Sequence, residues 1–284
     1  MFRVVSLHFT RRCNFRCSFC YREKGEETMD KELFLGLPNY LRKLTEQVAL
    51  GGGEPTLYPD LVREFAQECK RNHLICNVTT NGYVMKDWKQ KDIKDFCEDI
   101  TMISISLDRE KIRYWESFDE YLHVIRKVGK HTQTGCNLLI DEEMLSGATF
   151  TRLVERLFEG GVDRIYSLYP KNSYFVDILP YKNYYLFLGA IYPEFYVDDL
   201  TYKILAEEKY INWQTPCHYG KDIISINEKG EVTGCSFSNE CKLKIERPKD
   251  ILKIKDVVFE ERYSCPYLKI GGDVFERFDT QSKL

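Results

Sequence analysis

The chain alternates strand-like and helix-like segments about six times, and this alternation constrains its fold more than any other feature. Strand-like runs occur at 3–9, 47–50, 74–80, 101–107, 134–140 and 164–169. Between them, apolar residues recur at helical spacing over about 30–44, 61–69, 86–97, 118–128 and 150–157. This order predicts an α/β fold with a parallel sheet and crossover helices, either doubly wound or a barrel. Six units are too few for a closed eight-fold barrel.

A second region follows the alternating one. We expect a helix over 174–192, and beyond about residue 198 the alternation stops. The remainder contains a predicted β-hairpin at 222–237, with its turn at 227–230, and four cysteines. We therefore predict a core over 1–197 and a small cysteine-rich annex over 198–284.

Composition excludes several classes of function. With 43% hydrophobic residues in 284, the chain can bury a substantial core. A net charge of −3 gives no global basic field, so no nucleic-acid partner is expected. The best apolar run, 184–192, is shorter than the roughly 18 residues of a membrane span. The segment MFRVVSLHFT lacks the apolar region of a signal peptide, so we expect a cytoplasmic protein without a membrane partner.

Three cysteines crowd together directly after the first predicted strand, in a C-x3-C-x2-C pattern formed by Cys13, Cys17 and Cys20. Eleven cysteines cannot all pair, and without an export signal the clustering favours metal or iron–sulfur ligation over disulfides. A zinc site would need His8 as its fourth ligand, although the strand fixes the direction of that side chain. An electron-transfer cluster would need a fourth cysteine nearby. The third alternative is a [4Fe–4S] cluster held by three thiolates, with one iron open.

The cysteine loop resembles that of the radical S-adenosylmethionine (SAM) superfamily. The motif is C-x3-C-x-Φ-C, formed by Cys13, Cys17, Phe19 and Cys20. Three further features agree with that family in chain order: Gly52-Gly53-Glu54 after the second strand, Asn81 at the end of the third, and Ser104, Ser106 and Asp108 on the fourth. The resemblance covers about 3–195 and implies a partial (βα)6 TIM-like barrel.

The resemblance also implies cofactors and their contacts. A [4Fe–4S] cluster would be held by the three cysteines, and its open iron would chelate the amino acid of SAM. The backbone of Gly52 and Gly53 and the carboxylate of Glu54 would receive the SAM amine. Ser106 and Asp108 would bind the ribose hydroxyls, and Ser104 shares a strand face with Ser106. Asn81 is either a SAM contact or a turn former before Gly82. No catalytic side chain is singled out.

The tail cysteines resemble a second kind of site. Cys217 and Cys235 enclose Gly230 as C-x12-G-x4-C, which looks like the start of the SPASM or shorter Twitch extension of radical SAM enzymes. With Cys241 and Cys265 as the remaining candidates, the count implies one auxiliary [4Fe–4S] cluster; a zinc site or free thiols is the alternative. The other four cysteines are expected in the core: Cys69, Cys76, Cys97 and Cys136.

The resemblance implies reductive cleavage of SAM to a 5′-deoxyadenosyl radical, which removes hydrogen from a substrate. An electron donor such as flavodoxin or ferredoxin would supply the first electron. We expect oxidation or crosslinking of the substrate, with the auxiliary cluster taking an electron. The substrate is either a ribosomally made peptide or a small molecule such as an alcohol or sugar. A non-enzymatic zinc or iron–sulfur module is a third hypothesis, which the Gly52-Gly53-Glu54 segment disfavours because storage needs no amine receptor.

Overall fold

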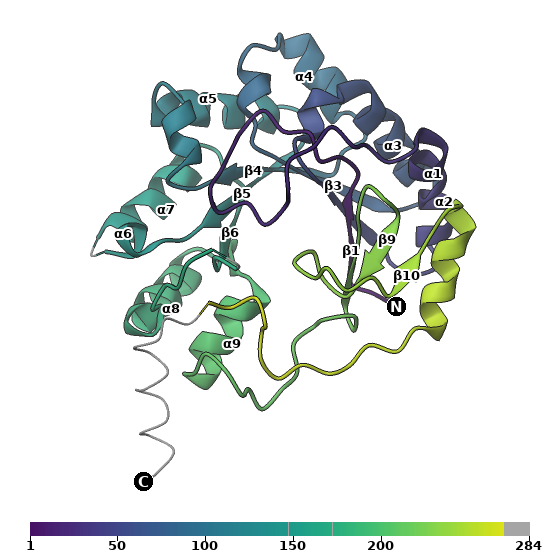
Figure 1. Cartoon of the computed structure of the whole chain (residues 1–284). Coiled ribbons are helices and arrows are strands. Elements are labelled where there is room, and N and C mark those ends of the chain that lie inside the picture. The colour runs from purple at the N-terminus through teal and green to yellow at the C-terminus, as the bar shows by residue number, and fades with distance from the viewer. Residues whose placement is uncertain (147, 172, 270–284) are drawn as a thin grey trace.

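The computed structural model describes residues 1–146, 148–171 and 173–269, and in them ten strands form one sheet (Figure 1). The strand order is β10-β9-β8-β1-β2-β3-β4-β5-β6-β7. The strands are β1 (Val4–His8), β2 (Gln47–Gly51), β3 (Ile75–Thr80), β4 (Met102–Leu107), β5 (Gln133–Leu139), β6 (Arg164–Leu168), β7 (Phe195–Val197), β8 (Ile223–Ile226), β9 (Glu231–Thr233) and β10 (Leu243–Lys244).

The sheet is mostly parallel and open. Every neighbouring pair from β8 to β7 is parallel, whereas β9 is antiparallel to both of its neighbours, β8 and β10. The sheet curves, and the helices surround its outer face (Figure 1). All six predicted strands form, and the architecture agrees with the predicted partial barrel.

Helices cover the outer face because one side of each is apolar. In α3, for example, Val62, Phe65 and Cys69 are buried, and Pro59 occupies the first turn, where its missing N–H costs no hydrogen bond. The helices are α1 (Lys31–Gly36), α2 (Pro38–Leu41), α3 (Pro59–Arg71), α4 (Gln90–Cys97), α5 (Phe118–Gly129), α6 (Glu142–Leu145), α7 (Thr149–Glu159), α8 (Lys182–Ile191) and α9 (Asp199–Glu207).

The strands separate two environments by simple alternation. On β4, Ile103, Ile105 and Leu107 belong to the hydrophobic core beneath the helices. The residues between them face the concave side, as Ser6 and His8 do on β1. Apolar side chains therefore anchor the helices, while small and polar side chains are left for the interior of the partial barrel.

Two predicted helices differ in extent from the observed ones. The segment predicted as one helix over 30–44 is divided into α1 and α2, because Pro38 has no N–H to continue the hydrogen-bond ladder. The segment predicted over 174–192 is helical only from Lys182, after a short 3₁₀ turn that contains Pro180. A proline disfavours helical backbone in the residue before it.

The alternation also continues further than predicted. After β6, the chain adds the three-residue strand β7 and helix α9, and β8 then pairs in parallel with β1. The predicted hairpin forms as β8 and β9, with its turn at 227–230, but it extends the main sheet. The annex is therefore not seen as a separate sheet, and part of the range 198–284 lies outside the described residues. The boundary at 197/198 stays a prediction.

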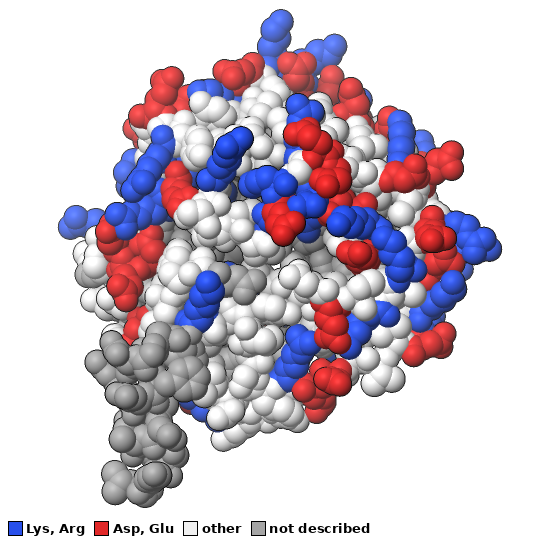
Figure 2. All heavy atoms as spheres, in the orientation of Figure 1, with Lys and Arg blue, Asp and Glu red and all other residues white. Residues whose placement is uncertain are grey.

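Two expectations from the sequence concern charge and membrane contact: no global basic field and no membrane span. On the face seen in Figure 2, basic and acidic side chains of the described residues are interspersed. Within those residues, we find no helix with the length and apolar character that a membrane crossing requires.

Candidate functional site

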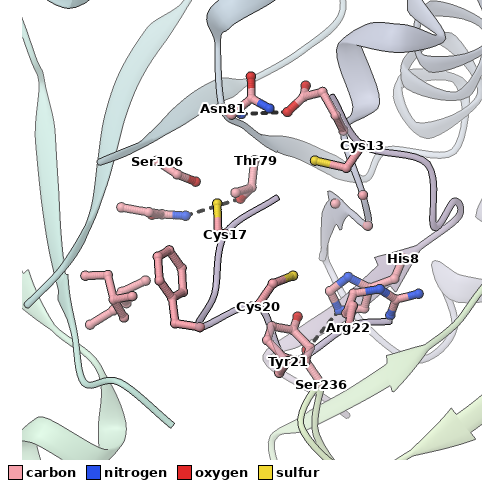
Figure 3. Close-up of a pocket in the computed structure, with 18 of the residues that line it drawn as sticks. His8, Cys13, Cys17, Cys20, Tyr21, Arg22, Thr79, Asn81, Ser106 and Ser236 are labelled. Atoms are coloured by element: carbon pink, nitrogen blue, oxygen red, sulfur yellow. Dashed lines mark hydrogen bonds between the residues drawn. The ribbon is translucent and has the colours of Figure 1, made fainter. Parts of the chain in front are cut away.

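A cavity of about 400 Å³ opens at the carboxyl ends of the strands, where an alternating fold predicts a site. The loop after β1 contributes Cys13, Cys17 and Cys20 to its wall, and the segment after β2 contributes 52–54. Asn81, after β3, and Ser106, on β4, also line it. Motifs that are far apart in the sequence therefore meet at one cavity (Figure 3).

The loop that carries the three thiols is anchored by its own aromatic residue. Phe15 is buried and stacks on Tyr114, with ring centroids 3.9 Å apart. Burial raises the pKa of Cys13 and raises that of Cys17 to about 11. Both groups are therefore thiols at neutral pH in the metal-free protein, and ligation would release their protons.

The three thiols are compatible with an iron–sulfur cluster. Among the described residues, no three His, Cys, Asp or Glu side chains are placed to hold one metal ion. A tetrahedral zinc site needs four ligand atoms within about 2.3 Å of one centre. In an iron–sulfur cluster each thiolate can bind a different iron. Thiols distributed around one cavity, as in Figure 3, are compatible with that arrangement.

Gly52 and Gly53 allow the end of β2 to pass against the cysteine loop. Gly53 N–H donates to the Thr10 carbonyl over 2.7 Å, and Glu54 N–H donates to the Arg12 carbonyl over 2.8 Å. A Cβ atom on Gly53 would lie 2.0 Å from the Arg12 oxygen, and Gly52 has a φ of +136°. Any larger residue would therefore push the cysteine loop away.

The Glu54 carboxylate is buried and held by neighbouring donors. Its Oε1 accepts from the Thr56 N–H over 2.9 Å and from the hydroxyls of Thr56 and Thr80, and its Oε2 accepts from the Asn81 N–H over 2.7 Å. The Asn81 side chain donates to Asn14 Oδ1 over 2.8 Å and accepts from the Tyr83 N–H. Asn81 thus joins the end of β3 to the cysteine loop.

The polar residues of β4 differ in position. Ser106 lines the cavity. Ser104, two residues earlier on the same strand, is buried against Gly135. Asp108, just beyond the strand, accepts from the Lys111 N–H over 2.8 Å, and its Oδ2 lies 2.7 Å from Lys111 Nζ. Neither Ser104 nor Asp108 is among the residues that form the cavity wall.

The wall on the β1 side was not expected from the sequence, because its members are some 230 residues apart. His8 Nε2 lies 3.1 Å from Ser6 Oγ and 3.0 Å from Ser236 Oγ, and the residue is buried (Figure 3). Burial, with a contribution from Arg22, lowers the His8 pKa to about 3. His8 is therefore a neutral member of a hydroxyl network.

The turn of the tail hairpin holds the cysteine loop through charged groups. Glu228 lies in this turn, and its side chain is only 4% exposed. Its Oε2 accepts from Arg22 Nη2, and its Oε1 lies 3.9 Å from Arg11 Nε. Both arginines belong to the loop that carries the three cysteines, so the tail supports that loop directly.

A second, smaller cavity of about 120 Å³ gathers three of the four tail cysteines: Cys217, Cys235 and Cys265. Burial raises the pKa of Cys235 and raises that of Cys265 to about 11. Cys241 does not line this cavity; it is exposed, and its thiol donates to the Leu243 carbonyl over 3.4 Å. The described part of the chain therefore brings together three of the predicted auxiliary ligands. The four cysteines expected in the core, Cys69, Cys76, Cys97 and Cys136, are all buried.

Comparisons with known proteins match the part of the chain that contains the cysteine loop. Residues 7–141 match the profile of the Radical SAM superfamily. A curated relative, the tungsten-containing aldehyde ferredoxin oxidoreductase cofactor-modifying protein of Pyrococcus furiosus, is 30% identical over 111 residues, which cover 37% of this chain and 31% of the relative. GTP 3′,8-cyclase of Haemophilus influenzae (strain 86-028NP) is 31% identical over 146 residues, which cover 47% of this chain and 42% of the cyclase. The matches thus span less than half of these relatives.

Solved structures share the fold at low sequence identity. Streptococcus suis SuiB bound to S-adenosylmethionine superimposes with a TM-score of 0.64 at 16% identity, covering 94% of this chain and 65% of SuiB. The protein anSMEcpe, solved with AdoMet and a Cp18Cys peptide, superimposes with a TM-score of 0.61 at 14% identity, covering 89% of this chain and 79% of anSMEcpe. At such identities the likeness concerns the fold alone. The sequence match assigns residues 7–141, just under half of the chain, to a domain of the Radical SAM superfamily, and the cysteine loop lies within that domain.

Proposed function

We propose that this chain is a radical SAM enzyme, with a [4Fe–4S] cluster on Cys13, Cys17 and Cys20 and with SAM bound beside it. The observation that carries the proposal is the meeting of the three thiols with Gly53 and Glu54 at one cavity. A bound cluster and SAM would supply a 5′-deoxyadenosyl radical that abstracts hydrogen from the substrate.

The residues of the chain would orient SAM and keep the loop in place. Glu54 Oε2 accepts one hydrogen bond from Asn81 and retains capacity for the SAM amine. Thr56 fixes the other oxygen of Glu54, so the carboxylate is already oriented before SAM arrives. The Ser106 hydroxyl, on the cavity wall, is the candidate for a ribose contact. Asp108 is engaged by Lys111, and its predicted contact with ribose stays a prediction.

We further infer that the second cavity holds an auxiliary [4Fe–4S] cluster on Cys217, Cys235 and Cys265. Three thiols line it together with the cations Lys171 and Arg262, which would offset the charge of thiolates. Cys241 is left out of this ligand set because it lies away from the cavity. A second redox centre suits an oxidation or crosslinking reaction, in which a substrate radical must lose one electron. The electron donor to the first cluster would be a flavodoxin or ferredoxin.

Anaerobic reconstitution tests the proposal. The protein with SAM and dithionite should produce 5′-deoxyadenosine and contain about eight irons per chain, four for each cluster. Cys17→Ala should abolish the product and lower the iron content to about half, whereas the matched change Cys241→Ala should leave both unchanged. Fully loaded protein that forms no 5′-deoxyadenosine would favour the non-enzymatic alternative, a binding module.

The substrate belongs to one of two classes, a peptide or a small molecule with hydroxyl groups. Candidates of both classes can be deuterated and incubated with the reconstituted enzyme. Deuterium in the 5′-deoxyadenosine would identify the substrate and the carbon from which hydrogen is removed. A substrate that transfers no deuterium at any carbon would be excluded.

A further inference from the structure

The two cysteine-lined cavities share part of their walls. Lys171 lies three residues beyond the end of β6, at the carboxyl side of the sheet, and lines both cavities. Phe237 also lines both, and Lys171 Nζ lies 5.2 Å from the centroid of its ring. Lys171 is therefore part of a wall that the two cysteine-lined cavities share.

The position of this ammonium is fixed by a buried partner. Lys171 Nζ lies 2.6 Å from Asp198 Oδ2, and the two side chains are 19% and 13% exposed. The other carboxylate oxygen of Asp198 accepts from the Thr201 N–H over 2.9 Å and so caps α9. A buried ion pair contributes little net stability, because desolvation offsets the attraction. The location of the pair at the shared wall indicates an electrostatic role.

Lys171 lines the second cavity together with Cys217, Cys235 and Cys265. Burial lowers the pKa of Lys171, but the Asp198 carboxylate outweighs burial, so the pKa lies above its ordinary value and the ammonium keeps its charge. An anionic centre held by these three thiols would therefore experience a positive field from Lys171.

We propose that Lys171 is a positioning residue of the second site, whose ammonium raises the reduction potential of a cluster held there. The inference rests on the proposed function and deepens it, since it names the group that makes the second centre a better electron acceptor. Reduction adds one electron to that cluster and makes it more negative. A nearby positive charge stabilises the reduced form, and the Asp198 carboxylate moderates the effect.

Removing the charge of Lys171 tests its role. Lys171→Met should lower the midpoint potential of the second cluster by about 59 mV or more, a tenfold change in its one-electron equilibrium constant. Lys171→Arg keeps the charge and should keep the potential. Lys182→Met is the matched control, because Lys182 also pairs with a carboxylate at 2.6 Å but lines neither cysteine cavity.

The measurement is a potentiometric titration of the reconstituted protein followed by electron paramagnetic resonance. The Cys13→Ala/Cys17→Ala/Cys20→Ala variant assigns the signal of the second cluster. Circular dichroism of each variant reports whether the fold is kept. About eight irons per chain with a midpoint unmoved by Lys171→Met would overturn the inference and leave the proposed function standing. About four irons in the unaltered protein would overturn both the auxiliary cluster and the role of Lys171.

Discussion

Replacing Glu228 by glutamine tests whether the tail supports the cysteine loop. The carboxylate is 4% exposed and accepts from Arg22, whose side chain is 14% exposed. Arg11 is the more distant partner and also pairs with Glu23 and Glu27. The substitution therefore leaves mainly the Arg22 guanidinium without a counter-charge in a buried place. Removing one partner of a buried ion pair costs about 3–5 kcal/mol, and partial exposure of Arg22 puts the expected loss near the lower end.

Urea denaturation of the metal-free protein measures this loss. Glu228→Gln should lower the free energy of unfolding by about 3 kcal/mol, with an unchanged dependence on urea concentration. Arg22→Met and the double variant complete a cycle, in which a coupling energy of up to about 3 kcal/mol should appear. Glu240→Gln is the control: Glu240 lies in the same tail and pairs with Lys242 and Arg262, but it is half exposed, so its removal should matter much less.

Two results would refute this reasoning. One is a loss for Glu228→Gln below about 1 kcal/mol, the range of a surface ion pair. The other is an equal loss of unfolding free energy for Glu228→Gln in the unaltered protein and in the Arg22→Met variant. Such a result would place the effect of Glu228 elsewhere in the turn. Because Arg22 is two residues from Cys20, we also expect Glu228→Gln to reduce iron retention at the first site.

Four further substitutions test the site and the core. Gly53→Ala should lower iron loading at least about twofold in iron assays, because its Cβ would meet the Arg12 carbonyl. Gly189→Ala lies at an exposed position of α8, where an added Cβ would meet no atom outside the local helix within 4 Å. It should gain about 0.5–1 kcal/mol of stability in urea denaturation. Thr80→Val removes a hydroxyl that donates to Glu54 and should weaken SAM binding about tenfold in equilibrium dialysis, a 1.4 kcal/mol effect. Tyr121→Phe leaves the Ile105 carbonyl without its 3.1 Å hydrogen bond and should cost about 1 kcal/mol in urea denaturation, with iron content unchanged.

Local patterns predicted the elements that local physics determines. The alternation of isoleucine with serine on β4 gave the correct buried face, because successive side chains of a strand point to opposite sides. The same pattern could not tell that Ser106 reaches the cavity while Ser104 lies beneath Gly135, since depth in a barrel depends on neighbouring strands. Pro38, which divides α1 from α2, and Pro180, which precedes the start of α8, are both visible in the sequence.

Long-range pairing left no comparable trace. Strand β8 has ordinary buried isoleucines, and nothing in its sequence indicates that it docks beside β1. The contacts of Ser236 with His8 and of Glu228 with Arg22 depend on that docking. The count of tail cysteines likewise suggested four ligands, but spacing along the chain could not show that only Cys217, Cys235 and Cys265 line the second cavity in the described residues.

The division of the cavity wall bears on what can be learned from relatives. The matched domain ends at residue 141 and contains the three cysteines and Glu54, the groups proposed to bind the cluster and SAM. The remaining wall comes from later residues, among them Lys171, Asp198 and Ser236. The sequence likeness therefore covers the part of the cavity that would generate a radical and stops before the part added by β6, β7 and the tail. Because substrate choice depends on side chains that face the substrate, the substrates of those relatives cannot be transferred to this chain. Variants at Lys171, Asp198 and Ser236 should therefore change substrate turnover while SAM cleavage without substrate persists.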